Sequence, residues 1–93
     1  MTLTKRQIAK KVSIELEIPF EEALHTIQCT LDTIRNELAD GGRVELRNFG
    51  VFDVYGISAR VGRNPKRPSE VVVIPPRNLV RFHPGKELKR DVN

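Results

Sequence analysis

The spacing of apolar residues changes once along this chain, and the change limits the folds it can adopt. The first pattern has intervals of three and four residues, which is the period of one helix face. It comprises Leu24, Ile27, Leu31, Ile34 and Leu38. Gly41 and Gly42 follow it and are typical of a helix end. From Arg43 onward apolar and charged residues alternate, as in a half-buried strand. The sequence therefore predicts a helical first half and a β-rich second half.

A shorter helix is predicted before the long one. Thr4 and Gln7 have the spacing of a capping box, in which each side chain satisfies a free backbone N–H at the helix start. An apolar stripe follows at intervals of four: Ile8, Val12 and Leu16. Pro19 ends this segment and can occupy the first turn of the next helix. The two helices, of about 12 and 21 residues by this pattern, are expected to form a hairpin.

The second half predicts strands, a turn and a short terminal helix. In chain order these are a strand at 43–47, a turn at 48–50, an extended segment at 51–59, strands at 70–74 and 79–82, and a helix at 83–89. Gly56 is expected to interrupt the extended segment. The predicted fold class is α+β. It has an N-terminal helical hairpin, a three-stranded antiparallel sheet with a long protruding β-ribbon arm, and a short C-terminal helix.

One domain is expected to span residues 1–93, because a chain of this length supports a single small core. Its expected parts are a helical dimerisation part (1–42), a sheet body with the terminal helix (43–56 and 77–93) and a β-arm (57–76). Aromatic residues are few, with four Phe, one Tyr and no Trp. Because so small a core is marginal alone, the chain is predicted to be a homodimer.

The expected arm has an unusual composition. Residues 57–61 carry too little apolar surface for a second core, and the strand at 71–74 is bracketed by Pro68, Pro75 and Pro76. Proline has no N–H to donate to a β-ladder, so it is found at the edges and ends of ribbons. An isolated two-stranded ribbon is marginal in water. Such an arm is expected to need a partner, and a nucleic-acid groove would suit it.

Charge is distributed unevenly between the two halves. The chain carries a net charge of +4. Residues 1–42 hold five basic and seven acidic side chains, whereas residues 43–93 hold eleven basic and five acidic ones. A basic half is typical of proteins that bind polyanions, and nucleic acid is the commonest such partner.

The single cysteine excludes an intrachain disulfide and suits a reducing compartment. The sequence shows no secretory leader and no long apolar run. The expected location is therefore the cytoplasm, without membrane contact.

Four segments closely resemble the HU/IHF family of bacterial histone-like proteins. They are RNFGVF at 47–52, ARVGRNP at 59–65, VIPP at 73–76 and FHPGKELK at 82–89. The resemblance implies an intertwined dimer whose two arms wrap and bend duplex DNA. It also implies that Pro65 enters a base step at the arm tip, with Arg63 and Asn64 in the minor groove. Lys5 matches a family position that touches the DNA backbone.

The chemistry of these side chains fits the implied roles. Proline is rigid and apolar and lacks an N–H, so Pro65 can wedge between bases without burying an unpaired donor. Arg63 supplies the charge that a narrow minor groove attracts. Lys86 lies near the start of the last helix, where free N–H groups and the side chain can bind one phosphate. The basic residues expected to meet phosphates from the arm are Arg60, Lys66 and Arg67. Those expected on the surface between the arms are Arg47, Arg81 and Lys89.

Several residues depart from the family pattern. Tyr55 and Ile57 stand at the arm base, where family members often carry basic groups. Asn48 replaces a glycine of the usual turn, and His83 replaces a common lysine. The tip at 66–69 is one residue longer than the usual turn, and its proline could act as the wedge instead. These departures leave the footprint and the bend angle open.

An enzyme or a metal site finds little support in the sequence. Four potential ligands share one face of the long helix: Glu21, His25, Cys29 and Asp32. A straight helix cannot converge four side chains on one ion, so a polar stripe is the simpler interpretation. Ser58 and Ser69 have no histidine near them in sequence to activate a hydroxyl. The chain is therefore predicted not to be an enzyme and to need no metal or cofactor.

The predicted function is an architectural one. The chain is expected to bind and bend duplex DNA with little sequence preference and to help condense the bacterial nucleoid. One alternative is an IHF-like subunit that selects sequences by DNA deformability, with a paralogue as its partner. Another is a protein-interaction module whose arms add strands to a partner sheet.

Overall fold

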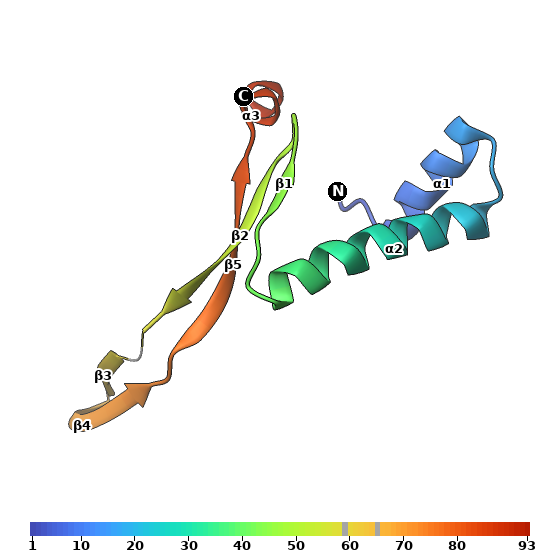
Figure 1. The fold of residues 1–93 in the computed structure, drawn as a ribbon. Coiled ribbons are helices and arrows are strands. Elements are labelled where there is room, and N and C mark those ends of the chain that lie inside the picture. Colours follow the sequence, from blue (N-terminus) through green and yellow to red (C-terminus); the bar gives the residue numbers. More distant parts are fainter. Residues whose placement is uncertain (59, 65) are drawn as a thin grey trace. The chain divides into compact units, whose positions relative to one another are not determined.

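A computed structural model describes residues 1–58, 60–64 and 66–93, with only the backbone described at 60–64, 67, 68, 70 and 72. Two compact units make up the chain, Met1–Glu37 and Leu38–Asn93. The first holds α1 and most of α2, and the second holds β1 to β5 and α3 (Figure 1). The α+β fold class and the order of its elements are confirmed.

Helix α1 spans Lys5–Leu16 and begins with the predicted capping box. The Gln7 N–H donates to Thr4 Oγ1 at 3.3 Å, and the Thr4 N–H donates to Gln7 Oε1 at 2.9 Å. The helix ends at Glu17, whose φ of 54° is left-handed. The Ser13 carbonyl accepts the N–H groups of Glu17 and Ile18 there. The predicted length of about 12 residues is confirmed, whereas the left-handed cap was not predicted, because glutamate is rarely left-handed.

Helix α2 spans Phe20–Ala39, close to the predicted length. Pro19 directly precedes the helix and accepts the Ala23 N–H through its carbonyl at 3.1 Å, so it lies just before the first turn and not within it. Glu21 and Glu22 lie in the first turn, where the helix dipole favours negative charge. The predicted stop is confirmed, since Gly41 has a φ of 83° and its N–H donates to the Leu38 carbonyl at 3.0 Å.

Three antiparallel strands form a sheet in the order β1-β2-β5. Their bounds are Val44–Leu46, Gly50–Ile57 and Arg77–Pro84. The turn between β1 and β2 places Asn48 at a φ of 67°, a region that glycine and asparagine tolerate best. Asparagine is therefore compatible with this turn. Gly56 pairs with Asn78 inside β2, so the expected interruption there was wrong.

Strands β3 (Arg60–Asn64) and β4 (Arg67–Ile74) form a two-stranded antiparallel ribbon beyond β2 and β5 (Figure 1). The first pair of the ribbon is Arg60 opposite Ile74, and the last pair of the sheet is Ile57 opposite Arg77. Each limb advances three residues between these pairs, so the two limbs are equal in length there. Within the ribbon the register shifts between Arg63, which lies opposite Val71, and Asn64, which lies opposite Arg67.

Helix α3 spans Lys86–Val92, with Gly85 as its N-cap. The Gly85 N–H donates to the Phe49 carbonyl at 2.7 Å, which ties the start of α3 to the β1–β2 turn. A Cβ at Gly85 would lie 3.0 Å from that carbonyl oxygen, so a glycine suits this position. The predicted terminal helix is confirmed, although Pro84 still belongs to β5.

The isolated chain buries little apolar surface. Among the described residues only Ala9 and Ala23 are buried apolar side chains, and none of the larger ones is fully covered. Phe82 stacks against Phe49 and Phe52, with ring centroids 5.6 and 4.7 Å apart, yet it stays 37% exposed. Gly50 is buried beneath this cluster, and a Cβ there would lie 2.5 Å from the Phe82 ring. The aromatic cluster of the isolated chain is therefore only partly covered.

Candidate nucleic-acid interface

The pairing register divides the three-stranded sheet into an apolar and a polar face. Side chains alternate along each strand, and directly opposite residues share a face. Phe52 lies opposite Phe82, whereas Asp53 lies opposite Arg81. The apolar face carries Val44, Leu46, Phe52, Val54, Val80 and Phe82. The polar face carries Glu45, Val51, Asp53, Tyr55, Ile57, Arg77, Leu79, Arg81 and His83. A charged ligand would meet the sheet on the polar face.

An ion-pair cluster occupies the middle of the polar face. Arg81 donates from Nε and Nη2 to the two Asp53 carboxylate oxygens at 3.2 and 3.3 Å. His83 Nε2 lies 3.1 Å from Asp53 Oδ2. The Arg81 guanidinium also lies over the Tyr55 ring, 4.6 Å from its centroid. Arg81, expected on the surface between the arms, is thus already paired.

The hydrogen bond from Arg81 lowers the pKa of the Asp53 carboxyl, and His83 adds to this effect while partial burial opposes it. An aspartate whose pKa is lowered by folding contributes stability above its unfolded pKa, and that contribution is lost as the pH falls through the folded value. Asp53→Asn is therefore expected to lower the melting temperature slightly at pH 7. The difference in melting temperature between the parent and Asp53→Asn should narrow as the pH falls below about 4. Thermal melts of both proteins across this range check it, and a difference that is constant with pH would contradict it.

Two of the predicted phosphate contacts lie around one hollow at the start of α3. Arg47 and Lys86 line this hollow of about 350 Å³, together with residues of the β1–β2 turn. Glu45 and Glu87 also line it, so the charge there is mixed. Lys89 follows within α3 and is exposed. The fold therefore brings Arg47 and Lys86 together, which their sequence separation did not show.

Lys5 belongs to the helical unit and takes part in a polar chain. Its Nζ donates to Gln28 Oε1, and Gln28 Nε2 donates to Asp32 Oδ1 at 2.9 Å. Asp32 also pairs with Arg35 at 2.7 Å. Next to Lys5, Arg6 lies over the Phe20 ring at 5.0 Å. Lys5 is exposed, so a polyanion could still reach it.

The predicted tip residues fall on the ribbon. Arg60, Arg63 and Asn64 belong to β3, and Arg67 belongs to β4. Their backbone lies on the arm as expected, while their contacts with DNA stay predictions. Lys66 is exposed in the turn between the two strands. The Pro65 prediction lies outside the described residues.

The polar stripe on α2, which the sequence favours over a metal site, makes side-chain contacts of its own. His25 Nε2 lies 3.6 Å from Cys29 Sγ, and the Asp32 carboxylate is engaged by Gln28 and Arg35. Within residues 1–58, 60–64 and 66–93, no three His, Cys, Asp or Glu side chains are grouped to hold a metal ion.

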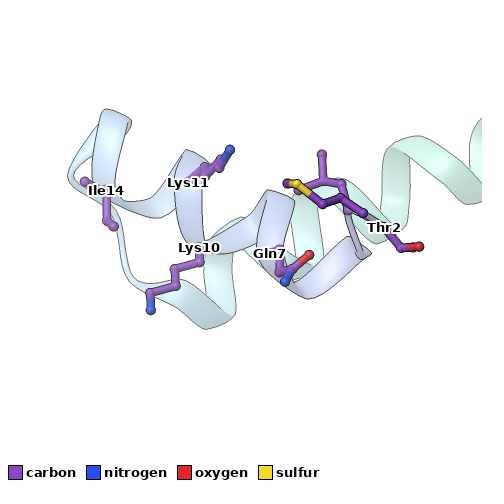
Figure 2. Close-up of a pocket in the computed structure, with 7 residues that line it drawn as sticks. Thr2, Gln7, Lys10, Lys11 and Ile14 are labelled. Carbon is purple, nitrogen blue, oxygen red and sulfur yellow. The ribbon is translucent and has the colours of Figure 1, made fainter.

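A groove of about 720 Å³ runs along α1. Figure 2 shows Ile14 at one end and Thr2 at the other, with Lys10 and Lys11 between them. Its lining contains no carboxylate, histidine or cysteine side chain. In the part of the chain that the structure describes, no helix has the length and apolar character needed to cross a membrane.

The Asp53–Arg81–His83 cluster was missed in the sequence. Asp53 and Arg81 are 28 residues apart, and nothing in the local pattern joins them. A signal existed, because the hairpin register sets Asp53 opposite Arg81, and opposite charges facing each other across two strands attract. Using that signal requires the register, which the sequence pattern left undetermined.

Comparisons with known proteins agree on one group. The family model described as "Bacterial DNA-binding protein" matches residues 3–93. The chain is 38% identical over 89 residues to a probable DNA-binding protein HU of Chlamydia trachomatis, covering 96% of this chain and 89% of the relative. It is 39% identical over 92 residues to integration host factor subunit alpha of Actinobacillus succinogenes, covering 99% and 93%. Among solved structures, an Anabaena HU–DNA cocrystal structure matches with a TM-score of 0.83 at 29% identity, covering 96% of each chain.

Proposed function

This chain belongs to the bacterial DNA-binding protein family of HU and integration host factor, and from that membership we propose that it binds and bends duplex DNA as an architectural protein. The observation that carries the proposal is the likeness, over nearly the whole chain, to an HU chain solved together with DNA. The members of this family are DNA-binding proteins and not enzymes, so membership confirms the prediction that the chain is not an enzyme.

In the proposed mechanism the whole chain acts as one domain, and the β3–β4 ribbon is the arm that enters the minor groove. Pro65 would unstack one base step, and Arg63 and Asn64 would lie beside it in the groove. Phosphates would be met by the remaining predicted residues: Arg60, Lys66, Arg67, Lys86, Lys5, Arg47 and Lys89. The basic second half of the sequence supports this assignment.

We further propose that the working form is a homodimer located at the nucleoid in the cytoplasm. Support for the dimer comes from Phe49 and Phe82, which are 47% and 37% exposed on the isolated chain. A second copy that covers these two rings would remove their exposed surface from water. A heterodimer with a paralogue would bury the same face, and sedimentation of the purified chain alone separates the two cases.

Sequence-independent binding is proposed over IHF-like selectivity. The chain is about equally similar to HU and to integration host factor subunits, so identity does not separate them. Selective binding by this family would depend on DNA deformability, since few bases are contacted. Mobility shifts on random, A-tract and nicked duplexes test the choice. Affinities on random and A-tract duplexes that agree within about threefold support the HU-like role, and a preference of a hundredfold or more supports the selective one.

The strand-addition alternative is separated by the salt dependence of binding. Contacts with phosphates release counterions, so log K should fall steeply with log salt concentration. Main-chain pairing with a partner sheet should give a much flatter slope. A flat slope on duplex DNA would therefore argue against the proposed function itself.

Lys86→Ala is expected to flatten the log K against log salt slope by about one unit, because one phosphate contact is lost. Lys10→Ala is the matched control, since Lys10 lines the groove on α1 and is not among the predicted contacts. Fluorescence anisotropy on one duplex at several salt concentrations measures both. If the Lys86 variant keeps the parent slope and affinity, Lys86 does not contact phosphate.

A further inference from the structure

Four side chains form one diagonal row across β2 and β5. Asp53 lies directly opposite Arg81, while His83 lies opposite Val51 and Tyr55 lies opposite Leu79, two residues away on either side. Contacts join the row from end to end, from His83 to Asp53, from Asp53 to Arg81, and from Arg81 to the Tyr55 ring. The row therefore acts as one unit on the polar face.

This row restrains Arg81, an arginine on the polar face where a duplex would meet the sheet. Two donors of the Arg81 guanidinium are directed at the Asp53 carboxylate, and its Cζ lies over the Tyr55 ring. Arg81 is still 49% exposed on its side chain, so it lies at the surface and not in a core. Its charge is matched by a carboxylate that is itself only 21% exposed. Arg81 thus offers less net attraction to a phosphate than an unpaired arginine would.

The other charged residues of the polar face add no net positive charge. Its other charged residues are Arg77 and Glu45, which are one of each sign. The face therefore carries as many carboxylates as arginines, whereas the arm sequence is strongly basic. On the proposed function, binding then depends on the arms more than on the sheet between them.

We propose that Asp53 is a positioning residue that withholds Arg81 and His83 from DNA phosphates and thereby favours bent over straight DNA. This inference rests on the proposed function. If released, Arg81 and His83 would contact a straight duplex lying on the sheet more closely than a duplex held by the arms. Withholding them then lowers the affinity for straight DNA by the larger factor, which is discrimination by removing an attraction from the unwanted partner.

The test compares Asp53→Asn with the parent on an intact and on a nicked duplex of the same sequence. Asparagine keeps the shape of the side chain and removes its charge. We expect Asp53→Asn to bind the intact duplex about three- to tenfold more tightly at low salt, with a slope steeper by about one unit. The gain on the nicked duplex should be smaller. Circular dichroism melts establish that the variant is folded.

Two further variants show whether Arg81 causes the gain in DNA affinity of Asp53→Asn. Arg81→Ala should cost more affinity in the Asp53→Asn background than in the parent, because only there is the guanidinium released. Glu15→Gln is the charge control, since it removes one exposed carboxylate that belongs to α1 and lines neither the sheet face nor the hollow of Arg47 and Lys86. An equal gain in affinity from Glu15→Gln would show a general charge effect and overturn the proposal.

Failure of this inference can be told from failure of the proposed function. If the parent binds DNA with a steep salt slope and Asp53→Asn binds no more tightly, Asp53 does not withhold the cations. If Asp53→Asn gains the same affinity on intact and nicked duplexes, the preference for bent DNA has another origin. If the parent itself shows no salt-dependent binding, the architectural function is wrong.

Discussion

Phe82→Ala is expected to break the dimer and lower the free energy of unfolding by about 3 kcal/mol or more per subunit. Phe82 lies at the centre of the aromatic cluster, touching both Phe49 and Phe52, and its ring covers the buried Gly50. In the proposed dimer the exposed part of this ring is covered by the second copy. Removing it would leave a cavity and also reduce the surface that holds the two copies together.

Sedimentation and melting at several protein concentrations measure this effect. The parent should sediment as a dimer, with a melting temperature that rises with concentration. Leu79→Ala is the control, because Leu79 lies on the same strand but on the polar face. It should lose some stability and keep the dimer. A folded parent monomer at micromolar concentration would contradict the dimer, and an intact Phe82→Ala dimer would contradict the role of the aromatic face.

Pro65→Ala is expected to remove most of the DNA bending while changing the affinity for straight duplex by less than about threefold. A wedge unstacks one base step at a cost of a few kcal/mol, which the extra wrapped surface offsets. The substitution removes the rigid ring and leaves Arg63, Lys66 and Arg67 to attract the duplex. The preference for nicked over intact DNA should fall by about tenfold, which corresponds to ~1.4 kcal/mol.

End-to-end fluorescence transfer on a short duplex measures the bend, with binding followed in parallel. Pro68→Ala is the internal control, since both prolines would be simple turn formers if neither entered the DNA. Equal bending by the parent and Pro65→Ala would end the wedge hypothesis. A loss seen only with Pro68→Ala would assign the wedge to that residue.

Local patterns predicted most of the fold. The capping box of Thr4 and Gln7, the helical spacing and the stop at Gly41 depend on neighbours a few residues away, and all three are confirmed. The error at Gly56 came from a longer-range effect, because Asn78 pairs with Gly56 across the sheet and keeps it in its strand.

The candidate site was less predictable than the fold. The positions of the basic arm residues follow from the sequence, but the pairing of Arg81 with Asp53 depends on the strand register. The hollow shared by Arg47 and Lys86 depends on the Gly85 N–H bonding the Phe49 carbonyl, a contact between distant segments. Interactions of this kind arise from tertiary structure and leave no periodic trace in a sequence.

The equal length of the two limbs between the sheet and the ribbon has a consequence for insertions and deletions. Both limbs advance equally between Ile57 opposite Arg77 and Arg60 opposite Ile74, so one added residue in either limb would turn every later side chain to the other face. Near the tip the limbs are already unequal, since three residues of β4 separate the partners of Arg63 and Asn64. Insertions and deletions can therefore accumulate at the end of the arm, while its base must keep a constant length.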